Sequence, residues 1–158
     1  MPKAVSLYLI KTSLVVIIIS LLTLKLKLLD QPIWLTALVI ASVFGLVFPL
    51  FDEKFLYPLY VKKTQLKGVL SRSLIFLVVF IPLAVFIVTS SSSPLGIGFV
   101  FGFMVTTAVD LIANLSTPEK FQRLYLFQFA RDFVLDEQRL IAFGFGFVSF
   151  LIVLLAVT

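Results

Sequence analysis

Apolar stretches of nearly 20 residues recur along this chain, and their length constrains its fold more than any other feature. A transmembrane helix needs about 20 consecutive apolar residues to cross a bilayer. Of the 158 residues, 61% are hydrophobic and 13% are charged, whereas soluble domains contain about 45–50% apolar and about 25% charged residues. A soluble fold could not cover so much apolar surface, so the sequence predicts an all-α, polytopic bundle of transmembrane helices.

The apolar segments predict about five spans in a single transmembrane domain at residues 1–158. The spans are expected at about 4–24, 32–51, 73–89, 95–115 and 140–157, and the two longer loops at about 52–72 and 116–139. The first segment imitates a signal peptide, but the residues after it offer no pair of small side chains for a peptidase. We therefore expect it to be retained as the first span.

The loop at 52–72 mixes lysines with aromatic side chains, so part of it is expected to lie among the lipid headgroups. Pro58 argues against one continuous helix there, because proline lacks the backbone donor that a helix interior uses. This loop should therefore be a short interfacial segment that follows a helix ending near Phe51.

The loop at 116–139 contains a good helix start, with Thr117 as the N-cap and Pro118 at the first helical position. Between Phe121 and Leu140, charged and apolar residues fall on all sides at a period of 3.6 residues. The sequence thus predicts one cytoplasmic helix without a clean amphipathic face.

The distribution of lysine and arginine predicts the orientation. Of the 13 basic residues, eleven lie in the N-terminal part and the loops 52–72 and 116–139, and the other two follow the first span. Because basic residues concentrate in cytoplasmic loops, we expect a cytoplasmic N-terminus and an outside C-terminus. This bias favours the cytoplasmic membrane of a prokaryote, and it explains the net charge of +5 without nucleic acid as a partner.

The absence of cysteine and histidine excludes much chemistry. Thiol nucleophiles, disulfides, histidine bases and histidine-bound zinc or haem are all unavailable. Glycine-rich phosphate loops and the acidic motifs of membrane transferases are also missing. The sequence therefore indicates no catalytic, cofactor-binding or metal-binding residue, and we expect a protein that is not an enzyme and uses no cofactor.

Small side chains recur every four residues in three of the expected spans. Such spacing places them on one helix face, where a neighbouring backbone can approach closely. The expected packing positions are Ala37, Ala41 and Gly45 in the second span, Gly98 and Gly102 in the fourth, and Ala142 and Gly146 in the fifth. These three helices are the candidates for mutual contact.

The same face of the fourth span continues with polar residues, namely Thr106, Asp110 and Asn114. Asp110 is the acidic residue well inside a span, where an unpaired carboxylate is costly. Lys11 is its best partner, because it lies at a similar depth in the first span. These four residues form a candidate intramembrane site, either a structural ion pair or a site that binds a proton or a cation.

Three functions follow from these features. The leading hypothesis is a non-enzymatic scaffold or accessory subunit that binds the bilayer and other membrane proteins, whereas a homo-oligomer without another partner would favour transport. The alternative is an oligomeric transporter or channel for ions or small solutes that uses Asp110. The third, a lipid-acting enzyme with Asp110 as its acid or base, has no second catalytic group within the membrane.

Reporter fusions test the orientation. Fusions after Asp30, Lys63, Ser92, Arg131 and Thr158 should report outside, inside, outside, inside and outside in turn, because basic loops stay in the cytoplasm. Alkaline phosphatase and fluorescent-protein activities measure the two sides. A cytoplasmic reading at Thr158 would contradict the five-span arrangement.

Overall fold

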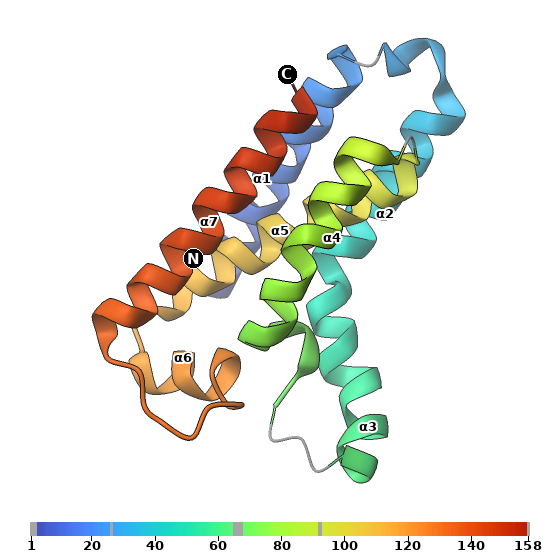
Figure 1. Cartoon of the computed structure of the whole chain (residues 1–158). Coiled ribbons are helices and arrows are strands. Elements are labelled where there is room, and N and C mark those ends of the chain that lie inside the picture. The colour runs from blue at the N-terminus through green and yellow to red at the C-terminus, as the bar shows by residue number, and fades with distance from the viewer. Residues whose placement is uncertain (1–2, 26, 65–67, 92, 158) are drawn as a thin grey trace.

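The computed structural model describes residues 3–25, 27–64, 68–91 and 93–157, and helices dominate these ranges (Figure 1). In chain order they are α1 (Lys3–Lys25), α2 (Pro32–Phe51), α3 (Tyr57–Thr64), α4 (Leu74–Ser90), α5 (Pro94–Asn114), α6 (Pro118–Tyr125) and α7 (Leu135–Val157). A π-helical turn at Asp52–Leu56 joins α2 to α3, and a 3-10 turn at Leu70–Arg72 precedes α4. The all-α class predicted from the sequence is confirmed.

Within the described ranges, four helices are long and apolar enough to cross a membrane: α1, α2 with its continuation to Lys62, α5 and α7. The apolar helix α4 is shorter, with 17 residues. At 1.5 Å per residue it extends about 25 Å, at the lower end of what a bilayer requires. The expected fifth span begins earlier than predicted, since α7 starts at Leu135 rather than near residue 140.

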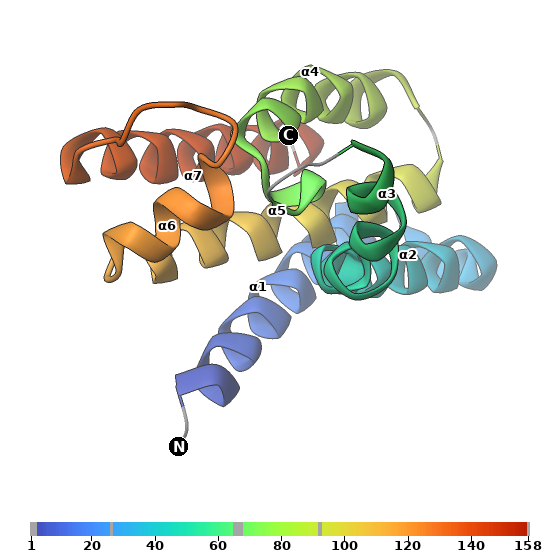
Figure 2. The ribbon, with the colours of Figure 1, turned by 90° about the horizontal axis from the view of Figure 1, so that it is seen from below.

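Helix α5 is the central element of the bundle. It contacts α1, α2, α4, α6 and α7, and Figure 2 shows it between α4 and α7 on one side and α1 and α2 on the other. Its side chains are buried without interruption from Val100 to Thr107. Helix α4 packs on it through aromatic rings, with the centroids of Phe80 and Phe103 4.6 Å apart.

Helices α2 and α5 pack backbone against backbone at their glycines. A Cβ atom added to Gly102 would fall on the carbonyl oxygen of Ser42, and one added to Gly45 would fall on that of Phe99. Gly98 meets the α2 backbone in the same way, at Leu38. Only glycine permits an approach this close. Helices in lipid associate through such close packing, because lipid supplies no hydrophobic drive for their association.

The other small residues of the pattern contribute less uniformly. Ala41 is 6% exposed in the α2–α5 contact, whereas Ala37 is half-buried. In α7, Ala142 is fully buried, but a Cβ added to Gly146 would stay 4.0 Å from Ile112. Helix α7 thus packs against α5 without needing a glycine at position 146.

The prediction of a break at Pro58 was wrong. The chain stays helical from Pro32 to Lys62, and the π-helical turn at Asp52–Leu56 lies just before the proline. A π turn shifts the hydrogen-bond pattern by one residue, which accommodates a proline ring that would clash in a regular α-helix. Helix α2 thus ends at Phe51 as expected, but the π turn and α3 continue the helical chain without an irregular break.

The expectation of one helix between Phe121 and Leu140 was also wrong. Helix α6 ends at Tyr125, and irregular chain separates it from α7. The side chain of Gln122 holds this connection, since its amide nitrogen donates to the Arg131 carbonyl at 2.9 Å and its oxygen accepts from the Phe133 amide at 3.2 Å. These side-chain bonds replace the helical ones that a continuous helix would make.

Shortened to eight residues, α6 is amphipathic after all. Phe121 and Tyr125, one turn apart, are 0% and 1% exposed, whereas Lys120 and Arg123 face outward. Thr117 occupies the N-cap position and Pro118 the first helical position, as expected, but the Thr117 side chain makes no capping hydrogen bond.

A pair of glycine variants tests the α2–α5 contact. Gly102→Ala should destabilise the bundle by about 1–3 kcal/mol or more, because the added methyl group displaces the Ser42 backbone. Gly144→Ala is the matched control, since a Cβ there meets nothing within 4 Å and alanine favours helix over glycine. Thermal unfolding in mild detergent should show a lower Tm for the first variant alone, and equal Tm values would contradict the proposed contact.

Candidate polar site at the basic end of the bundle

Figure 1 places α3, α6 and the first turns of α7 at one end of the bundle, here called the basic end. The segments at this end carry most of the described basic residues: Lys54, Lys62, Arg72, Lys120, Arg123, Arg131 and Arg139. At the opposite end, Lys25 donates to the Ala156 carbonyl oxygen at 3.0 Å, which joins the last turns of α1 and α7. The fold therefore separates positive charge along the bundle axis, as the positive-inside pattern of the sequence would require.

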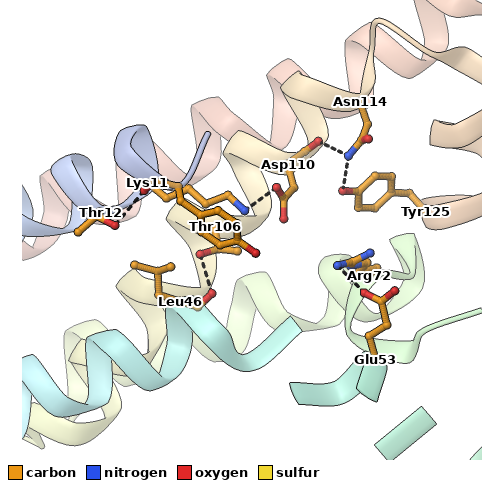
Figure 3. A network of polar contacts seen from close by, with 10 residues as sticks. Lys11, Thr12, Leu46, Glu53, Arg72, Thr106, Asp110, Asn114 and Tyr125 are labelled. Atoms are coloured by element: carbon orange, nitrogen blue, oxygen red, sulfur yellow. Dashed lines mark hydrogen bonds and ion pairs between the residues drawn. The ribbon is translucent and has the colours of Figure 1, made fainter. Parts of the chain in front are cut away.

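Lys11 and Asp110 form an ion pair inside the bundle, with the lysine Nζ 2.6 Å from Asp110 Oδ1 (Figure 3). Their side chains are 7% and 16% exposed. Either charge alone would be costly at this depth, so each supplies the partner that the other requires. Residues Val5 to Ile10 of α1 are exposed or half-buried, so Lys11 is the first buried residue of α1 among those whose burial is described.

The other two expected site residues have different partners. Thr106 is 2% exposed and donates its hydroxyl to the Leu46 carbonyl of α2 at 3.1 Å. The Asn114 side-chain nitrogen donates to the Asp110 carbonyl at 2.7 Å and to the Tyr125 hydroxyl at 3.3 Å. The structure thus brings Lys11, Asp110 and Asn114 together, whereas the Thr106 hydroxyl is used to bind α2 to α5.

Tyr125 connects the site to α6 and was not identified from the sequence. Burial raises the pKa of its phenol, and the negative charge of Asp110 raises that pKa further, while Arg72 opposes the shift. The hydroxyl therefore stays protonated at physiological pH. Asn114 and Tyr125 lie on segments whose proximity no spacing in the sequence indicates.

Arg72 and Glu53 form a second ion pair, with Arg72 NH2 2.9 Å from Glu53 Oε2. Asp52 positions both of them, because it ties the π turn to the 3-10 turn. Its carboxylate is buried and accepts hydrogen bonds from the Ser71 amide at 2.8 Å and the Tyr60 hydroxyl at 3.2 Å. Residues 52, 53 and 72 carry part of the site, although the sequence indicated only a basic loop there.

A cavity of about 540 Å³ opens at the basic end. The Asp110 carboxylate and Asn114 line its inner part, Arg72 and Glu53 line one wall, and α6 lines another. Among the described residues, no three acidic side chains come together as a metal site would require. The residues that line the cavity provide charges of both signs and hydrogen-bonding groups.

No family model, curated protein or solved structure matches this chain.

Replacing one partner tests the buried ion pair. Lys11→Met should lower the stability by up to about 3–5 kcal/mol, because it leaves the Asp110 carboxylate buried without its cation. The double variant Lys11→Met with Asp110→Asn should recover much of this loss, since no charge is left unpaired. Thermal unfolding in detergent measures both, and a single variant as stable as the wild type would show that the pair does not hold α1.

Proposed function

We propose that this protein is a non-enzymatic component of a membrane, a scaffold or accessory subunit that holds partners in the bilayer. One observation carries the proposal: the middle of the bundle is closed. The cavity at the basic end reaches inward to Asp110, and a second cavity at the opposite end reaches Leu38 and Ile97. Between them α5 is buried from Val100 to Thr107, about 10 Å of packed helix.

The polar residues that a transport path would use also support the scaffold proposal. Asp110 is paired with Lys11, and the Thr106 hydroxyl is bonded to the α2 backbone. Glycine contacts hold α2 against α5 along the same segment. Opening a path through this interface would separate two backbones in direct contact. The α2–α5 contact therefore favours a rigid scaffold over a transport path.

A second candidate function, an oligomeric ion or small-solute transporter, is favoured by the position of Asp110. Its carboxylate lines the cavity while it is paired with Lys11. A proton or a cation that entered from the basic end could compete with the lysine for this carboxylate. Such competition would make the Lys11–Asp110 ion pair reversible, rather than a permanent structural contact.

Reconstitution separates the two functions. In liposomes that contain the purified protein, proton and potassium flux should equal that of protein-free liposomes, because the packed segment blocks the bundle. Under the proposal, Asp110→Asn changes stability but not flux. A flux in the wild type that Asp110→Asn abolishes would overturn the proposal in favour of transport. Mild-detergent purification should yield a stable complex with another membrane protein, and a lone homo-oligomer would count against a scaffold.

A further inference from the structure

Helix α6 presents two cations to the cavity at the basic end. Lys120 and Arg123 are three residues apart and therefore lie on the same flank of the helix. Both are exposed and both line the cavity. Phe121 and Tyr125 bury the adjacent face of α6 in the bundle, so the two cations stand on a fixed wall.

The charge around the cavity is unbalanced. Each of its two carboxylates already has a cation, at 2.6 Å for Asp110 with Lys11 and at 2.9 Å for Glu53 with Arg72. In the part of the chain that the structure describes, no carboxylate pairs with Lys120 or Arg123. Neither cation on this wall is therefore held in an ion pair with a described residue, so both can turn to a phosphate monoester carrying about −1.5 to −2.

Hydrogen-bond donors stand beside these cations. Thr117 lines the cavity, and its hydroxyl makes no capping hydrogen bond to α6, although Thr117 occupies the N-cap position. The first backbone N–H groups of α6 are therefore without a side-chain cap, at the end of the helix where its dipole favours an anion. A phosphate oxygen at this position could accept from the hydroxyl while the two cations neutralise its charge.

Three apolar residues also line the cavity, namely Leu7 from α1, Ala113 from α5 and Leu124 from α6. Basic pockets between transmembrane helices are suited to anionic lipid headgroups. The volume of about 540 Å³ lies within the roughly 300–1,000 Å³ typical of ligand sites.

We propose that this cavity binds a phosphate group, held by Lys120 and Arg123 and hydrogen-bonded by Thr117. The group is carried either by a lipid, with its chains leaving the cavity past Leu7, or by a soluble phosphate ester. This binding goes beyond the proposed function, since it requires neither a protein partner nor transport. A flux measurement therefore does not test it.

The test measures the Tm of the purified protein in mild detergent against the concentration of three probes: dihexanoyl phosphatidic acid, dihexanoylglycerol and glycerol 3-phosphate. A ligand that binds the folded state raises the Tm as its concentration exceeds Kd. Phosphatidic acid should raise the Tm in a saturable way, and the uncharged dihexanoylglycerol should not. If glycerol 3-phosphate acts equally well, the carrier is a soluble ester; if it has no effect, the carrier is a lipid.

Matched double variants locate the site. Lys120→Gln with Arg123→Gln should weaken phosphatidic acid binding at least tenfold. Lys62→Gln with Arg139→Gln removes the same charge from side chains of the basic end that do not line the cavity, and should change the affinity less than twofold. All four side chains are exposed, so the Tm of each double variant without ligand should stay close to that of the wild type.

Two results would overturn the proposal. One is a Tm that no phosphate probe raises in a saturable way. The other is an equal loss of affinity in both double variants, which would show that binding follows total charge rather than the cavity.

Discussion

The direct contact between the backbones of α2 and α5 is the constraint on which the rest of the bundle depends. Lipid is as apolar as the side chains of a transmembrane helix, so helices associate there through close packing rather than through the hydrophobic effect. Gly45, Gly98 and Gly102 allow that packing because each lies against a carbonyl group of the opposite helix. With α2 packed against it, α5 is the central helix that α1, α4 and α7 also contact (Figure 2).

The second requirement is that every polar group at membrane depth has a partner, since water is not there to supply one. Lys11 and Asp110 neutralise each other, and the Thr106 hydroxyl finds the Leu46 carbonyl. The position of α1 follows from this requirement as much as from apolar packing. Asp110 also lines the cavity at the basic end, so one member of the ion pair belongs both to the packed bundle and to the cavity wall.

The basic end is held together by different interactions. Its polar groups are positioned by hydrogen bonds within and between the local turns. The buried carboxylate of Asp52 joins the π turn to the 3-10 turn and so brings Glu53 beside Arg72. Phe121 and Tyr125 fasten α6 over the end of α5. These two attachments therefore position the residues of both segments that line the cavity beside Asp110 and Asn114.

The sequence by itself determined the membrane character, the helical class, the small residues of α2 and α5, and the pairing of Lys11 with Asp110. The length of an apolar stretch, the spacing of small residues and the depth of a charge within a span each belong to a single helix. Each can therefore be counted along the chain. Only the tertiary structure decided that a π turn and α3 continue the helical chain past Pro58, that α6 ends at Tyr125, and that Arg72, Glu53 and Tyr125 approach Asp110. These outcomes depend on how far each helix is rotated and where its turns bind, and such contacts between distant segments leave no periodic signal in the sequence.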